Sequence, residues 1–194
     1  MAVCKTNWRV GGNGMSTVIN PEVIGVFGLM VTVIVFGLEQ VGVGVKGGNL
    51  SEISKSLAYI AIIFGGATQI FTSLCMYLFS VGGDHSLYLG TVFGFFGLFW
   101  VMVGVFFIKG GDKKVLAHFF GVSWFLILAF LIIAIQDAFP WYFITVLVLI
   151  LGLLAVLIPA WYGKGAIWGR IAGVINILIG LFAIPIFLGA IGLM

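Results

Sequence analysis

The stretch NPEVIGVFGLMVTVIVFGLEQVG, Asn20 to Gly42, is the segment that decides the fold of this chain. It opens with Pro21, which suits the first turn of a helix, and it closes at a glycine. Between them lie about 20 mostly apolar residues, which is the length that one bilayer crossing requires. The stretch therefore predicts a transmembrane helix with polar groups at both ends.

The composition of the whole chain agrees with a membrane location. Of its 194 residues, 62% are hydrophobic and 8% are charged, and the mean hydropathy is +1.29. Soluble domains carry about a quarter charged residues. The sequence contains no HExxH motif, no Cys and His cluster at metal spacing and no nucleotide-binding glycine loop. We therefore predict an all-α integral membrane protein that is not an enzyme, without a cofactor, a metal or a nucleic-acid partner.

The chain divides into a polar N-terminal tail, residues 1–19, and a transmembrane domain, residues 20–194. Backbone polar groups inside a bilayer need internal partners, so the apolar runs of this domain are expected to be helices. Six spans are predicted at about 21–43, 54–80, 87–108, 115–136, 140–161 and 169–192. Glycines four residues apart predict close helix packing at Gly165, Gly169 and Gly173, and at Gly90 and Gly94.

Lysine and arginine residues set the expected orientation. The first, third and fifth links hold seven of them, whereas the opposite side holds two. Because positive residues favour the cytoplasmic side, we place these links in the cytoplasm and both termini outside. The expected location is the plasma membrane or a bacterial or archaeal inner membrane, crossed several times. The seven are Lys46, Lys55, Lys109, Lys113, Lys114, Lys164 and Arg170, and the two are Lys5 and Arg9.

Three pieces of the chain resemble one transporter family. Asn20 and Pro21 followed by Gly25 and Gly28, the segment FGGATQIF (64–71) and the segment TVFGFFGLFW (91–100) resemble the first three helices of the acetate uptake transporter family. The resemblance implies a homo-hexameric ring with one path per subunit, embedded in the lipid bilayer, for a small molecule such as acetate or succinate. A weaker resemblance, in IAGVINILIGLFAIPIFL (171–188), is to the urea and amide channel family, whose termini lie outside.

Polar side chains inside apolar spans are the candidates for substrate binding, because such groups are costly in lipid. Asn20 and Pro21 begin a helix whose amides can bind a carboxylate, although Asn20 and Glu22 also suit an ordinary helix start. Gln69 can both donate and accept hydrogen bonds, either to a substrate or to a neighbouring helix. Thr32 and Thr72 complete the predicted pore-lining set. The chain departs from the family pattern at Glu22, whose negative charge would repel an acid.

A hydrophobic constriction is implied by the same resemblance. Leu29 and Phe96 align with the narrow ring of the acetate family, and Trp100 is a further candidate, with plain helix or lipid contact as the alternative. Two groups are candidates for sensing protons, against simple solvation: Glu39, which we place near the outer end of the first span, and His85, in an outer turn.

The sequence thus favours a transporter or channel for a small monocarboxylate. A charged carboxylate is expensive to move through a dry constriction, so proton coupling or passage of the neutral acid is expected. The alternative is a passive channel for urea or another small neutral amide, which the orientation and the last span favour. A third possibility is a structural membrane protein without a conduction path.

Overall fold

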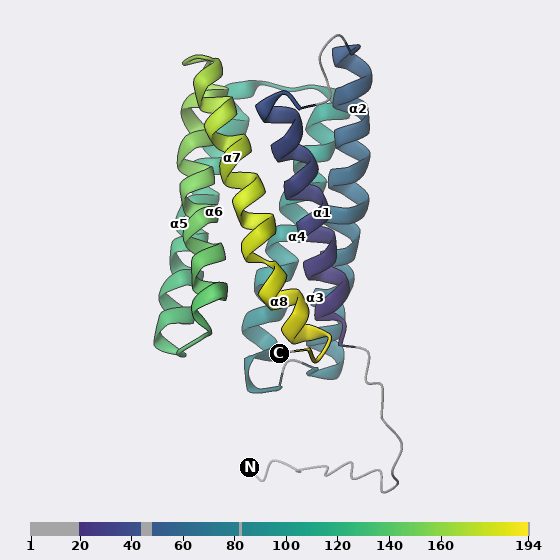
Figure 1. Cartoon of the computed structure of the whole chain (residues 1–194), viewed down its shortest axis with the longest axis vertical. Coiled ribbons are helices and arrows are strands. Elements are labelled where there is room, and N and C mark those ends of the chain that lie inside the picture. The colour runs from purple at the N-terminus through teal and green to yellow at the C-terminus, as the bar shows by residue number, and fades with distance from the viewer. Residues whose placement is uncertain (1–19, 44–47, 82, 194) are drawn as a thin grey trace, which may run out of the picture.

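The computed structural model describes residues 20–43, 48–81 and 83–193, and every regular element in these ranges is helical. The helices run roughly parallel to the long axis of the molecule (Figure 1). In chain order they are α1 (Glu22–Val41), α2 (Leu50–Ile60), the π-helical segment η1 (Ala61–Ala67), α3 (Thr68–Phe79), the short 3-10 helix η2 (Gly83–His85), α4 (Ser86–Lys109), α5 (Lys113–Gln136), α6 (Trp141–Trp161), α7 (Ala166–Phe182) and α8 (Ile184–Ala190).

The prediction of an all-α protein with six membrane spans is confirmed. Among the described residues, six helical stretches are long and apolar enough to cross a bilayer. They are Glu22–Val41, Leu50–Phe79, Gly83–Lys109, Lys113–Gln136, Trp141–Trp161 and Ala166–Ala190, so most predicted boundaries are shifted by only a few residues. The predicted polar tail, residues 1–19, lies outside the described residues.

Side-chain caps explain where two of the spans begin. The side-chain oxygen of Asn49 accepts a hydrogen bond from the Ser51 amide at 3.0 Å, so α2 begins four residues earlier than hydropathy suggests. At α5, Asp112 Oδ1 accepts from the amides of Lys114 and Val115, at 2.7 and 3.2 Å. Capping satisfies amides that the first helical turn leaves free, and these caps extend the helices into polar sequence.

Glycines allow close contact between several helices. A Cβ placed on Gly37 of α1 would lie 2.8 Å from the carbonyl oxygen of Gly173 in α7, and a Cβ on Gly97 of α4 would lie 3.1 Å from that of Gly66 in η1. The predicted stripe therefore holds at Gly173, whereas Gly165 and Gly169 face open space. Gly165 precedes the first residue of α7, so it takes no part in a helix contact. Gly90 and Gly94 pack against α3 as expected.

Two spans depart from a regular α-helix, which hydropathy does not predict. The second span contains η1, whose Gly65 and Gly66 face α4. The sixth span is interrupted at Ala183, between α7 and α8, and Pro185 stands in the first turn of α8. Because proline has no amide hydrogen, it cannot continue the hydrogen bonding of α7, and the break follows.

The two ends of the bundle differ in charge. One end holds Asn20, η2, the link between α5 and α6, and the C-terminal helix α8 (Figure 1). We call it the outer end, following the predicted orientation, and its described charged residues Glu22, Asp84 and Asp137 are acidic. The inner end is rich in basic residues: Lys55, Lys109, Lys113, Lys114, Lys164 and Arg170.

Candidate functional site

Four cavities form a row through the bundle from the outer end to the inner end, each sharing part of its wall with the next. We call them the outer vestibule, the Gln69 cavity, the constriction cavity and the inner chamber. The vestibule and the Gln69 cavity share Val26, Phe93, Phe143 and Ile186. The next shared walls are Leu29, Phe96 and Ile150, and then Phe99, Trp100 and Leu153.

The outer vestibule, about 190 Å³, is the largest of the four. Its polar side chains are Asn20, Glu22 and Tyr142, set among aromatic rings. Asn20 Oδ1 accepts a hydrogen bond from the Glu22 amide at 3.1 Å, and Asn20 Nδ2 donates to Glu22 Oε2 at 3.3 Å. Asn20 therefore bonds to the first residue of α1 and holds the Glu22 carboxylate at the mouth of the row.

The Gln69 cavity, about 40 Å³, is apolar except for the side chain that names it. Gln69 is 1% exposed, and neither its Nε2 nor its Oε1 has a hydrogen-bond partner among the described residues. A buried amide left unpaired costs on the order of 1–3 kcal/mol. The fold therefore keeps a donor and an acceptor unpaired in a side chain of the cavity wall, with both atoms covered by their neighbours.

The constriction cavity, about 20 Å³, is the smallest of the four. A space of this size holds about one water molecule. Leu29 of α1 and Phe96 of α4 contribute to its wall, with Trp100 one turn beyond Phe96. The remaining wall residues are apolar: Val33, Phe95, Phe99, Ile150, Leu153, Leu154 and Ile179.

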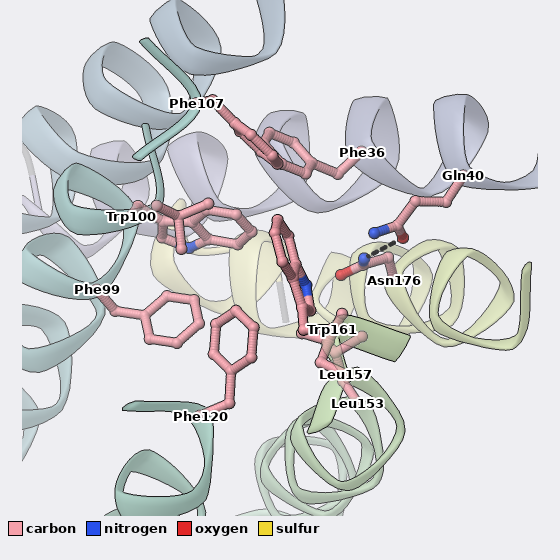
Figure 2. A pocket seen from close by; sticks show the side chains of 11 residues that line it. Phe36, Gln40, Phe99, Trp100, Phe107, Phe120, Leu153, Leu157, Trp161 and Asn176 are labelled. Atoms are coloured by element: carbon pink, nitrogen blue, oxygen red, sulfur yellow. Dashed lines mark hydrogen bonds between the residues drawn. The ribbon is translucent and has the colours of Figure 1, made fainter. Parts of the chain in front are cut away.

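The inner chamber, about 40 Å³, combines aromatic rings with an amide pair (Figure 2). Asn176 Nδ2 of α7 donates a hydrogen bond to Gln40 Oε1 of α1 at 2.9 Å, while Asn176 Oδ1 has no partner among the described residues. Phe36, Phe107, Phe120 and Trp161 line the same chamber, and the amide pair lies at one side of it (Figure 2).

The walls of the row carry very little charge. Among the described residues that line the four cavities, Glu22 is the one charged side chain. The described residues also contain no group of three or more His, Cys, Asp or Glu side chains that could hold a metal ion. Neutral polar side chains, namely Gln69, Trp100 and the Gln40 and Asn176 pair, stand in otherwise apolar walls, although the amide atoms of Gln69 and the indole nitrogen of Trp100 are covered by neighbouring side chains.

The row brings together five of the residues that the sequence singled out, namely Asn20, Leu29, Gln69, Phe96 and Trp100. The other three predicted path residues, Pro21, Thr32 and Thr72, line none of these four cavities. Their polar groups form hydrogen bonds within the protein instead.

Thr32 Oγ1 donates to the Gly28 carbonyl at 2.8 Å. Thr72 Oγ1 donates to the carbonyl of Pro21, also at 2.8 Å. The second bond joins α3 to the start of α1, next to the vestibule residues Asn20 and Glu22.

The two candidates for proton sensing lie at opposite ends. His85 is at the outer end, with its Nδ1 3.9 Å from Asp137 Oδ2 and its ring 4.7 Å from that of Phe139. The placement of Glu39 near the outer end is wrong, because α1 starts at the outer end and Glu39 lies close to its last residue. Glu39 instead lines a groove between α1 and α2 at the inner end.

Sequence reasoning did not select Gln40, Asn176 or Trp161 for the site. Gln40 and Asn176 carried a signal, since each is an amide in an apolar run, but their contact joins residues 136 positions apart. Trp161 ends a span and resembles any interfacial aromatic residue. Its place in the inner chamber follows from helix packing alone.

Comparison with known proteins gives one informative result. The sequence matches no family model, and no curated protein matches it either. Among solved structures, one titled "Structure of the bacterial acetate channel SatP" is similar, with a TM-score of 0.72 and 22% identity over 88% of this chain and 90% of that chain. The chain is thus a multi-pass membrane protein with the fold of the bacterial acetate channel SatP, the fold that its resemblance to the acetate uptake transporter family implied.

Proposed function

We propose that this protein is a membrane channel or transporter for a small monocarboxylate such as acetate, with succinate as a larger candidate. The observation that carries the proposal is Gln69, a fully buried amide with both polar atoms unpaired, beside a row of cavities along the bundle. The fold shared with the acetate channel SatP supports it. The narrow constriction cavity favours acetate over succinate.

The neutral acid, or the acid together with a proton, is the form that this row suits. An anion would have to shed its water at a constriction of about 20 Å³, which is costly without a compensating cation. Gln69 Nε2 is suited to donate to the carbonyl oxygen of the acid, and Gln69 Oε1 to accept its acidic proton. The methyl group then faces Leu29 and Phe96, which line the same cavity.

The outer vestibule fits this mechanism. An ionised Glu22 at its wall repels a carboxylate anion but not a neutral acid. His85, exposed beside Asp137 at the same end, is our candidate for sensing external protons. We further propose that the protein sits in a plasma membrane or inner membrane as a hexameric ring with one path per subunit. Native mass spectrometry of the detergent-solubilised protein tests this stoichiometry.

Urea or another small neutral amide is the second candidate substrate. The observation that favours it is the absence of a lysine or arginine from the described walls of the row. A side-chain amide such as Gln69 both donates to a urea oxygen and accepts from a urea nitrogen. The predicted outside position of both termini agrees with this alternative.

Flux into proteoliposomes separates the two substrates. Labelled acetate and labelled urea are supplied side by side at about pH 5.5 and about pH 7.5, between which the neutral fraction of a carboxylic acid changes roughly a hundredfold. Protein-free liposomes and a Gln69→Leu variant correct for acid that crosses the lipid itself. The proposal expects acid-stimulated acetate flux above both controls. Urea flux that is independent of pH, without acetate flux, would show that the protein is an amide channel instead.

A further inference from the structure

The indole of Trp100, whose side chain lines the row, carries another unpaired polar atom, which neighbouring side chains cover. Trp100 is 5% exposed, and its Nε1 has no hydrogen-bond partner among the described residues. The side chain lines both the constriction cavity and the inner chamber. An indole N–H is a donor with no acceptor function, so its partner has to be an acceptor atom.

Packing holds this indole in one position. A Cβ placed on Gly65 would lie 2.6 Å from Trp100 Cγ and 3.0 Å from Cδ1, so the absence of a side chain at Gly65 is what admits the ring. Phe36 and Phe99 contact the indole edge-on, with ring centroids 5.2 and 5.5 Å away. Figure 2 shows the indole among the rings of the inner chamber.

The local backbone explains how Gly65 reaches this position. Gly65 belongs to η1, the π-helical segment of the second span, and faces α4. A π-helical turn widens the helix and is frequent at functional sites. Such a segment is less favourable than a regular α-helix, and here it seats a tryptophan whose donor stays unpaired. Neither feature is explained by stability.

We propose that Trp100 Nε1 donates a hydrogen bond to an acceptor oxygen of the transported molecule as it passes from the constriction cavity to the inner chamber. The inference rests on the proposed function only in requiring that a solute crosses this row. Phe96 and Trp100 are four residues apart on α4, so they lie on one face of the helix. Gln69 and Trp100 then form hydrogen-bonding stations on the outer and inner sides of the Leu29 and Phe96 constriction.

The chemical class of the ligand follows from the donor. Carboxylic acids, carboxylates and urea all present an acceptor oxygen to an N–H group. Ammonium and alkylammonium ions present donors alone, so Trp100 gives them no hydrogen bond. This hydrogen bond therefore favours small oxygen-bearing solutes over ammonium ions, whichever of the two proposed substrates is correct.

Nuclear magnetic resonance of the full-length protein in nanodiscs, with ¹⁵N-labelled indoles, tests the inference. Comparison with Trp100→Phe assigns the Trp100 resonance, and the probes are acetate, urea and methylammonium. We expect a saturable downfield shift of the Trp100 indole proton with acetate or urea and none with methylammonium. Trp124, a half-buried tryptophan that lines none of the four cavities, supplies an indole resonance that stays unchanged.

Transport provides the second measurement. Trp100→Phe keeps an aromatic ring and removes the donor, so we expect uptake per folded protein to fall about three- to tenfold. The smaller ring leaves part of the space of the indole empty, so some thermal stability is lost as well. Trp124→Phe should leave uptake unchanged. An indole proton that does not move with any oxygen-bearing probe would overturn the inference, as would equal uptake losses in the two variants.

The outcomes also separate this inference from the proposed function. If acetate is taken up but the Trp100 indole resonance does not shift, the proposed function stands and the hydrogen bond from Trp100 is rejected. If the protein transports urea but not acetate, and urea shifts the Trp100 resonance, the hydrogen bond from Trp100 stands and a carboxylate substrate is rejected. If Trp100→Phe does not fold, titration of the unmutated protein with acetate and urea, followed by its indole resonances, still tests the hydrogen bond.

Discussion

Two buried amide sites, at Gln69 and at Asn176, occupy the same bundle but differ in how they are satisfied. Asn176 is 2% exposed and bonds to Gln40, beside the close contact of Gly37 with Gly173. Gln69 is 1% exposed, and neither of its side-chain amide atoms has a partner among the described residues, whereas at Asn176 Oδ1 alone is unpaired. The first site is therefore explained largely by the packing of α1 against α7, whereas the second is not explained by packing at all.

The difference shows which buried polar group indicates a ligand. Interhelical hydrogen bonds in membranes stabilise a bundle modestly, so the bond between Asn176 and Gln40 has a structural reason. An unpaired amide lowers stability, and a fold retains it only where another molecule completes its bonds or where function requires the strain. Gln69 and Trp100 belong to this class, and Asn176 belongs to it in part, through its unpaired Oδ1.

The largest effect is expected at the packed site. Gly37→Ala would bring a Cβ within 2.7 Å of Ile177 Cγ1 and 2.8 Å of the Gly173 carbonyl oxygen, so α1 and α7 must separate. We expect a stability loss of about 1–3 kcal/mol, measured by thermal or denaturant unfolding in detergent. Gly152→Ala is the matched control, because a Cβ there meets nothing within 4 Å. Equal stability of the two variants would contradict the tight contact.

The next effect is expected at the unpaired site, in transport rather than in stability. Gln69→Leu removes both hydrogen-bonding groups and fills a similar volume. Substrate uptake should fall by about tenfold or more, since a lost hydrogen bond to a polar solute costs roughly 1.5 kcal/mol. The unfolding temperature should stay the same or rise, because an unpaired buried amide is removed. Lost stability with unchanged uptake would show that Gln69 has a structural role.

The same substitution at the paired site gives the opposite pattern. Asn176→Leu breaks the hydrogen bond to Gln40, so stability should fall by about 0.6 kcal/mol, the average for interhelical bonds in membranes. Uptake should fall less than in Gln69→Leu. A larger transport defect at Asn176 than at Gln69 would reverse the comparison and make the inner chamber the main binding site.

The smallest effect concerns the pH dependence of uptake. Glu22→Gln removes the one charge from the described walls of the row, and that charge opposes an anion only while Glu22 is ionised. Acetate uptake at about pH 7.5 should therefore rise about twofold relative to uptake at about pH 5.5. Asp84→Asn, at the same end but outside the vestibule wall, should leave the ratio unchanged. An unaltered ratio in Glu22→Gln would exclude a role for this carboxylate in selecting the neutral acid.

Much of the candidate site could be read from single residues. Gln69 stood out because an amide in an apolar span is costly wherever it faces, and Leu29 and Phe96 followed from a resemblance in their helices. Thr72 carried the same polar signal as Gln69, yet its hydroxyl bonds to the Pro21 carbonyl. A sequence shows that a polar group needs a partner but does not show whether the protein provides it.

The sequence by itself determined the membrane location, the six spans and most of their boundaries, because partition into a bilayer depends on the composition of each stretch taken alone. The tertiary structure decided the rest. It paired Asn176 with Gln40 and formed the π-helical segment η1 around Gly65, and it left the side-chain polar atoms of Gln69 and Trp100 without partners among the described residues. These outcomes depend on which helices become neighbours and on how closely glycines let them approach, which no single stretch specifies.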